Sequence, residues 1–243
     1  MTTTQASRYG YADLEPLMAL MTGDEKHGPA ATSTLDVLWV LYDRVLNIDR
    51  ADPDAPGRDR FLLSKGHGPV AYYAVLAAQG FIGVEVLPGF AGFASPLGHH
   101  PDRTLIPAVE ISSGSLGHGL GLAVGTALGL RAQGLTRPRV FTLLGDAELD
   151  EGSNHEAIAF AGATGLDSLH AVVVDNSSAT HGWSGGIATR FDREGWSVMT
   201  IDGRDHDAIE AALNAPHHGR PHAVIAVVEP KDSSVTRPGI NVR

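Results

Sequence analysis

Apolar positions in this chain occur either as short runs or as patterns spaced by three and four residues, and the two kinds alternate. Largely apolar runs of strand length stand at Val140 to Leu144, Leu169 to Val174 and Ala223 to Val228. Such runs are typical of strands that are buried on both faces of a sheet. The short run before Ser64 and the segment Trp196 to Ile201 are interpreted as two further strands.

Helices are predicted between these runs. Helical spacing or composition covers residues 11–21, 71–79, 154–165 and 205–213, and one more helix carries Leu35, Leu38, Val40, Leu41 and Val45. Ser33 or Thr34 is interpreted as the cap that begins this helix, after a loop around His27. The segment 177–195 contains glycines without a clear period, so it is predicted to be a loop.

Strand, helix and strand in succession predict an α/β fold with a mostly parallel sheet. No repeat or long linker divides residues 1–243, so we expect a single domain with a loose N-terminal tail and a polar tail after Glu229. A hydrophobic fraction of 43% fits a globular chain, and its net charge of −10, without a Lys/Arg cluster, argues against nucleic acid and anionic membranes as partners.

The sequence has no cysteine, which excludes disulfides and thiolate chemistry. Its N-terminus lacks the charged and then apolar pattern of a signal peptide. No apolar stretch approaches the roughly 20 residues that span a bilayer. We therefore expect a cytoplasmic protein.

Two polar residues stand where neighbouring strands are predicted to end. Gly145 and Asp146 follow the first central run, and Asn176 follows the second. Because parallel strands open on the same edge of a sheet, Asp146 and Asn176 are expected to meet there. Their oxygens suit Mg²⁺, which also binds water and phosphate, and Gly145 leaves room for a diphosphate. The alternative is that the two residues only cap loops.

Several histidines and glycines are further candidates. His67 stands between glycines just before a helix, where N–H groups attract anions, although a loop or capping histidine fits as well. The pair His99-His100 lacks the partners of a zinc site, which we reject. The small residues Gly119, Gly121, Ala123, Gly125, Ala127 and Gly129 predict a helix that packs very closely against another backbone or a ligand.

These motifs, in this order, resemble the N-terminal domain of transketolases, which transfer a two-carbon ketol unit between sugars with thiamine diphosphate. The similarity runs from His27 to about Val228 and rests on DRFLLSKGHG, GHHPD, SSGSLGHGLGLAVGTALGL, GDAELDEG and VDNSSATHG. It implies the three-layer thiamine diphosphate-binding fold and Mg²⁺ as a second cofactor. It also implies an N-terminal subunit of a split transketolase, active only with a C-terminal subunit in an α2β2 heterotetramer on sugar or sugar-phosphate substrates.

The resemblance assigns a role to individual positions. It implies Mg²⁺ ligation by Asp146, Asn176 and the main-chain carbonyl of Ser178. It implies contacts with the cofactor from His67, Gly114, Ser115, Leu116, Gly145, Asp146, Ala147, Glu148, Asn176 and Thr180. It implies catalytic roles for His27, His67, His100 and Glu151, with Glu151 near an interface and coupled to a glutamate of the partner.

Three positions depart from the family pattern. Ala147 replaces a usual glycine and is acceptable only if its φ is negative. Gly28-Pro29 inverts the usual order after His27, and the C-terminal segment lacks the usual Lys-Gly-Lys-Gly loop and histidine, a contact that Lys231 or the partner would supply. Two alternatives follow, namely a decarboxylase or carboligase that uses a 2-oxo acid, and a non-catalytic subunit that binds thiamine diphosphate.

Overall fold

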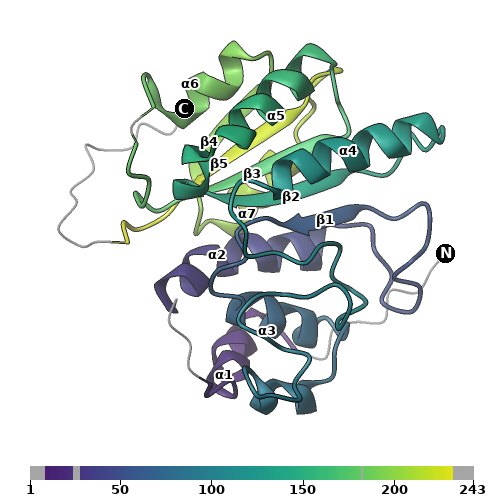
Figure 1. Ribbon diagram of the computed structural model, residues 1–243, viewed down its shortest axis with the longest axis vertical. Coiled ribbons are helices and arrows are strands. Elements are labelled where there is room, and N and C mark those ends of the chain that lie inside the picture. The colour runs from purple at the N-terminus through teal and green to yellow at the C-terminus, as the bar shows by residue number, and fades with distance from the viewer. Residues whose placement is uncertain (1–8, 24–27, 182, 232–243) are drawn as a thin grey trace.

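A parallel five-stranded sheet forms the centre of the molecule (Figure 1). The computed structural model describes residues 9–23, 28–181 and 183–231. All strand pairs are parallel and the strand order is β1-β2-β3-β5-β4. The strands are β1 (Arg60–Leu63), β2 (Val140–Gly145), β3 (Leu169–Asp175), β4 (Ser197–Asp202) and β5 (His222–Val227). The carboxyl ends of β1, β2 and β3 are therefore adjacent.

Helices cover both faces of this sheet, which confirms the three-layer α/β fold (Figure 1). One face carries α1 (Leu14–Ala19), α2 (Gly28–Val40), α3 (Val70–Ala78) and α7 (His206–Leu213), and the other carries α4 (Gly119–Ala132), α5 (Gly152–Ala163) and α6 (Gly186–Arg193). Four short helical segments complete the described elements: η1 (Tyr11–Asp13), the π-helical η2 (Leu41–Val45), η3 (Val84–Gly89) and η4 (Ala147–Asp150).

The strand side chains alternate between two hydrophobic cores. Phe141 and Leu143 of β2 join the core on the α2 and α3 side, whereas Val140 and Leu144 join the core on the α4 and α5 side. This alternation is the two-residue period of a strand, and it explains why β2 reads as nearly continuous apolar sequence. Burial of each such side chain contributes about 1.5–3 kcal/mol to the free energy of unfolding. These contacts hold the strands, and with them the strand ends, in position.

Two predictions about local structure were wrong. Helix α2 begins at Gly28 rather than after Ser33 or Thr34, because Pro29 then lies in the first turn, where a missing N–H costs nothing. Segment 177–195 is not wholly a loop, since α6 occupies Gly186–Arg193. Ile187, Ala188 and Phe191 pack into the core from one face of this short helix, but the glycines and polar residues around them obscured that spacing in the sequence.

The small-residue helix α4 differs in part from its prediction. A Cβ added to Gly119 would clash with Ser64 at 2.2 Å, so this glycine does permit close packing. Gly121, Gly125 and Gly129, one turn apart along α4, would meet no atom of the described chain within 4 Å. That face is therefore open. Among the described helices, none is both long enough and apolar enough to cross a membrane.

Candidate functional site at the carboxyl ends of the strands

A carboxylate at the end of β2 binds the loop that follows β3. Asp146 is only 2% exposed, and its Oδ2 accepts hydrogen bonds from the backbone N–H groups of Ser178 and Ala179, at 2.6 and 3.1 Å. Its Oδ1 accepts a further hydrogen bond from the Ser178 hydroxyl at 2.6 Å. The two strand ends thus lie side by side, as the sequence predicts.

Asn176 brings a buried oxygen to the same edge. Its side chain is 4% exposed, and its Oδ1 has no hydrogen-bond partner among the described residues. The next residue, Ser177, has a φ of 57°, a left-handed conformation that is uncommon outside glycine and that clusters at functional sites. Leaving a buried acceptor unpaired costs about 1–3 kcal/mol, a cost that a bound cation would remove.

The donor set fits a hard cation. A carboxylate and an amide oxygen suit Mg²⁺, which needs few protein ligands because water and phosphate oxygens complete its octahedron. Within the described parts of the chain, no three His, Asp or Glu side chains are grouped so that they could hold a metal ion. The edge therefore offers oxygen ligands for Mg²⁺ rather than the ligand set of a zinc site.

The short helix η4 carries the chain away from Asp146. Ala147 is its first residue and is not among the described residues with positive φ. The condition that the sequence set for an alanine at this position is therefore met, and its Cβ introduces no backbone strain.

Glu148 is buried beneath the site, with 1% of its surface exposed. Its Oε1 accepts hydrogen bonds from the Gly117 N–H at 3.0 Å and from the Ser64 hydroxyl, and its Oε2 accepts one from the Gly145 N–H at 3.4 Å. Burial raises the pKa of Glu148, although these hydrogen bonds oppose the shift. The side chain joins three segments of the site: the loop after β1, the loop before α4 and the end of β2.

Two of the three predicted catalytic histidines lie together. The rings of His67 and His100 meet edge to face, with centroids 5.0 Å apart and an angle of 86° between their planes. Gly114 has a φ of 122°, and a Cβ placed there would meet Cδ2 of His100 at 2.7 Å. Only glycine permits this approach, which brings the predicted cofactor loop against the imidazoles. His27 lies outside the described residues.

The same loop reaches the predicted interface residue at its other end. The Ser115 hydroxyl and the Leu116 carbonyl oxygen each lie 3.1 Å from Nδ1 of His118. A Cβ on Gly117, whose φ is 81°, would meet Cβ of Glu151 at 2.6 Å. Glu151 itself is exposed. The predicted cofactor loop therefore approaches His100 at Gly114 and Glu151 at Gly117.

Thr180 is held beside the site by an acidic residue. Its backbone N–H and its hydroxyl both donate to Oδ2 of Asp150 at 3.0 Å, and the residue is exposed. Asp150 also accepts a hydrogen bond from the His181 N–H at 3.2 Å. The loop after β3 is thus fixed at two successive points, first on Asp146 and then on Asp150.

Sequence reasoning missed Lys65 as a site residue. Its Cδ lies 3.1 Å from the position that a Cβ on Gly145 would take, and its Nζ donates to the Ser33 hydroxyl at 3.0 Å. Burial lowers the pKa of Lys65 to about 8, whereas the nearby carboxylates of Asp146 and Glu148 oppose that shift. A lysine directly after an apolar strand, just ahead of Gly66 and His67, was the available signal.

Comparison with known proteins gives the same family for most of the chain. The family described as "Transketolase, thiamine diphosphate binding domain" matches residues 18–228. A protein named ferredoxin fas2, from Rhodococcoides fascians, is 57% identical over 224 residues, which cover 92% of this chain and 74% of that protein. One of the subunits of an apulose-4-phosphate transketolase from Actinobacillus succinogenes is 36% identical over 207 residues, which cover 82% of this chain and 75% of that subunit.

Solved structures resemble the fold as well. The transketolase from Campylobacter jejuni aligns with a TM-score of 0.70 at 25% identity, and the alignment covers 90% of this chain. It covers 38% of that transketolase, so the present chain spans little more than a third of the solved protein's length.

Proposed function

Because this chain belongs to the transketolase family, through its thiamine diphosphate-binding domain, we propose that it is the N-terminal subunit of a split transketolase. In this proposal a two-carbon ketol unit passes from a ketose to an aldose with thiamine diphosphate and Mg²⁺. The observation that carries the proposal lies at the adjacent ends of β2 and β3, where the buried carboxylate of Asp146 holds the loop after β3 and the buried amide oxygen of Asn176 has no partner among the described residues.

The metal and the diphosphate would bind at the edge formed by β1, β2 and β3. Asp146, Asn176 and the Ser178 carbonyl are the proposed Mg²⁺ ligands. The Lys65 side chain packs beside Gly145, and Lys65 offers a cation that can replace the contact missing from the C-terminal segment. A partly desolvated ammonium near a diphosphate is favoured because its charge is weakly screened.

The loop from Gly114 to Leu116 would lie against the rings of the cofactor, and Thr180 would close the other side. Glu148 supports this loop from below, since its carboxylate accepts hydrogen bonds from Ser64, Gly117 and Gly145. When bound, thiamine diphosphate would supply a nucleophilic carbon and would accept the electron pair left on the transferred two-carbon unit.

The histidines would act on the substrate. His67 and His100 lie at one end of the loop, and His100 is exposed, so its ring can reach a sugar hydroxyl or carbonyl from solvent. We propose that they orient hydroxyls and transfer protons, together with His27. Their number favours polyhydroxylated substrates over 2-oxo acids, so ketol transfer is preferred to decarboxylation or carboligation.

A partner subunit is part of the same proposal. The open glycine face of α4 and the half-exposed side chains of Leu122 and Phe160 form an apolar surface, and Glu151 is exposed beside the cofactor loop. A C-terminal subunit that covers this surface would complete the site in an α2β2 heterotetramer. Similarity to one of the subunits of an apulose-4-phosphate transketolase supports such a division. We propose a cytoplasmic location for the assembly.

The ferredoxin name of one relative gives no second function. Iron–sulfur clusters need cysteine thiolates, and these 243 residues contain no cysteine. A ferredoxin activity therefore cannot be carried by this sequence, and the name does not alter the proposal.

The test uses the full chain with a candidate C-terminal subunit. Calorimetry with thiamine diphosphate and Mg²⁺ is compared for the unchanged protein, Asp146→Ala and the surface control Asp167→Ala. We expect Asp146→Ala to lose binding by at least a hundredfold, while the control is unchanged. Product analysis with ketose donors and with pyruvate then identifies the chemistry. Equal cofactor affinity in all three proteins, or turnover of pyruvate alone, would refute the proposal.

A further inference from the structure

A second cavity, of about 400 Å³, lies beside α5 and α6. It is lined by Asp150, His155, His181, Trp183, Ser184, Arg190 and Arg193. Its volume falls within the range of roughly 300–1,000 Å³ that small-molecule sites occupy. Asp150 and the His181 N–H also share a hydrogen bond that fixes the loop after β3, but none of the lining residues belongs to the proposed metal ligands.

An ordered aromatic wall stands inside this cavity. The imidazole of His155 stacks on the indole of Trp183, with centroids 4.8 Å apart and 18° between the rings. The Arg190 guanidinium lies 5.9 Å from the centroid of the same indole. Stacking of this kind restrains both side chains and holds the arginine near the opening. The cavity therefore has a defined shape rather than a set of independent surface side chains.

The lining carries more positive than negative charge. The cavity has two arginines and two histidines but a single carboxylate, Asp150. Oδ2 of Asp150 accepts hydrogen bonds from Thr180 and His181, and its Oδ1 is buried without a partner among the described residues. Arg190 pairs with Glu194 at 3.5 Å, yet its Nε is buried and has no hydrogen-bond partner among the described residues. No carboxylate in the described ranges forms an ion pair with Arg193.

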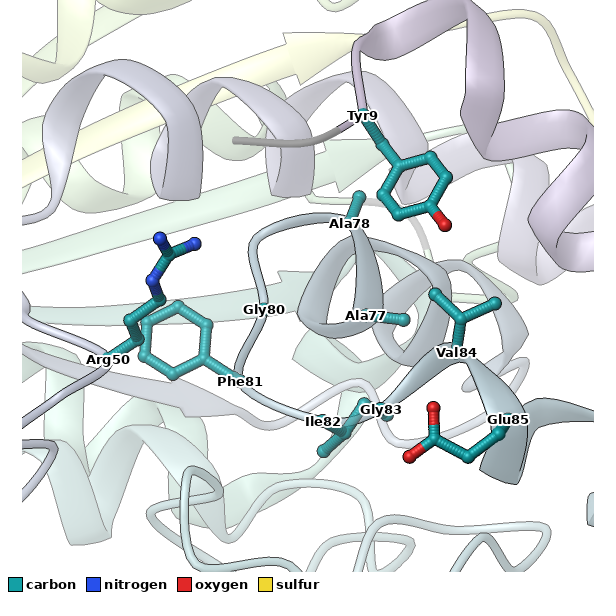
Figure 2. Close-up of a pocket in the computed structure, with 10 residues that line it drawn as sticks. All are labelled: Tyr9, Arg50, Ala77, Ala78, Gly80, Phe81, Ile82, Gly83, Val84 and Glu85. Atoms are coloured by element: carbon teal, nitrogen blue, oxygen red, sulfur yellow. The ribbon is translucent and has the colours of Figure 1, made fainter. Parts of the chain in front are cut away.

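This excess of cations contrasts with the rest of the molecule. The whole chain has a net charge of −10, so a cationic cavity is not the result of a basic surface. A cavity of similar volume at the end of α3 contains one residue of each sign, Arg50 and Glu85, among mostly apolar neighbours (Figure 2). Arg193, which has no ion pair within the described ranges, and the unpartnered Nε of Arg190 indicate that the second cavity takes an anion from outside the chain.

We propose that this cavity binds the phosphate group of a small phosphorylated molecule, with Arg190 and Arg193 as its principal ligands. Guanidinium groups bind phosphate oxygens through paired hydrogen bonds, and they do so more specifically than ammonium groups. His155 and His181 add ring N–H donors, and Trp183 provides the wall against which the rest of the phosphorylated molecule packs. This site is separate from the proposed diphosphate site, so the inference does not depend on the proposed function.

Tryptophan fluorescence gives a direct test, because Trp39 and Trp196 are buried and Trp183 lines the cavity. The full chain is titrated with inorganic phosphate and with glycerol 1-phosphate, in the absence of Mg²⁺ and thiamine diphosphate. We expect a saturable change that disappears in Trp183→Phe, and tighter binding of the ester if the wall contributes. Calorimetry on Trp183→Phe follows binding once the fluorescence signal is gone.

Charge variants then locate the anion. The double variant Arg190→Gln/Arg193→Gln should bind phosphate at least tenfold more weakly, whereas Arg44→Gln/Arg131→Gln removes the same charge elsewhere and should bind normally. Arg193→Gln alone, which breaks no ion pair of the described chain, serves if the double variant unfolds. Lys65→Gln, which removes the cation at the strand ends, should leave phosphate binding intact.

Three results would overturn the inference. One is the absence of saturable binding, and another is equal weakening in the two arginine pairs, which would indicate general electrostatics. The third is loss of the phosphate response in Lys65→Gln with no loss in Arg193→Gln, which would place the anion at the strand ends. Equal affinity for phosphate and for its ester would support an anion site at the arginines, but it would refute a phosphorylated molecule as the ligand in favour of the free ion.

Discussion

At the amino ends of the strands, the buried carboxylate of Asp59 accepts hydrogen bonds from the Arg139 N–H, from the Arg139 guanidinium and from the Asn47 N–H. At the carboxyl ends, Asn176 is buried to the same degree but leaves its Oδ1 unpaired, and Ser177 beside it has a left-handed backbone. At the amino edge of the sheet a buried carboxylate thus accepts hydrogen bonds from the chain, whereas at the carboxyl edge a buried amide oxygen has no hydrogen-bond partner among the described residues.

This difference separates stability from ligand binding. A buried group whose partners all come from the chain stabilises the fold whether or not a ligand is present. A buried group without a partner destabilises the empty protein and becomes favourable only when a ligand arrives, and ligand binding then raises the stability of the whole domain. Substitutions at the amino edge should therefore lower the free energy of unfolding, whereas substitutions at the carboxyl edge should weaken ligand binding.

The largest effect is expected at the amino edge. Asp59→Ala leaves the Arg139 guanidinium and two backbone N–H groups without their acceptor, and breaking a buried ion pair in this way costs about 3–5 kcal/mol. Urea unfolding measures the loss. The exposed pair of Arg131 and Asp167, at 3.6 Å, provides the control, since Asp167→Ala should cost at most about 1 kcal/mol. Similar costs for the two variants would contradict the comparison.

A smaller effect is expected from acidification at the same edge. Burial lowers the pKa of His170 well below its usual value, and His217, His222 and Arg139 lower it further. The unfolded chain takes up this proton near pH 6.5 while the folded chain does not, so stability is complete above that pH and falls below it. The loss is at most about 1.4 kcal/mol per pH unit for this group.

Urea midpoints at pH 7.5 and 5.5 test this expectation, with His170→Phe as the comparison because His170 already stacks on Phe141 at 4.5 Å. The variant should lose less stability than the unchanged protein over that interval. An identical loss in both proteins would remove His170 as the cause.

The smallest effect on stability is expected at the carboxyl edge. Asn176→Ala removes a buried oxygen that has no partner in the described chain, which should stabilise the empty protein, but it also leaves a small cavity, which should destabilise it. Because the two effects oppose each other, the free energy of unfolding should change by less than about 1 kcal/mol. Added Mg²⁺ and thiamine diphosphate should raise the unfolding temperature of the unchanged protein but not that of the variant. Strong destabilisation of the empty variant would show that Asn176 is a structural residue.

Sequence patterns predicted the strand ends but not the contacts beneath them. Asp146 and Asn176 could be predicted from the sequence because each follows a long apolar run whose type and end are well defined. The resemblance predicted Glu148 as a cofactor contact, but not its burial or its partners from distant segments, and Lys65 was not predicted because its importance depends on burial and on such partners. Helix α6 was missed because the glycines and polar residues around Ile187, Ala188 and Phe191 obscured the helical spacing of these three.

The hydrogen bond between Ser64 and Glu148 joins positions 84 residues apart, which has a consequence for the order of assembly. Closing so long a loop is entropically costly and is compensated only by contacts that form at the same time. A nascent chain that ends before Glu148 contains β1 and β2, but it lacks the other three strands and the acid that anchors the loop preceding α4. Competence to capture a coenzyme would therefore arise late in folding, in one step with the joining of β1 to β2.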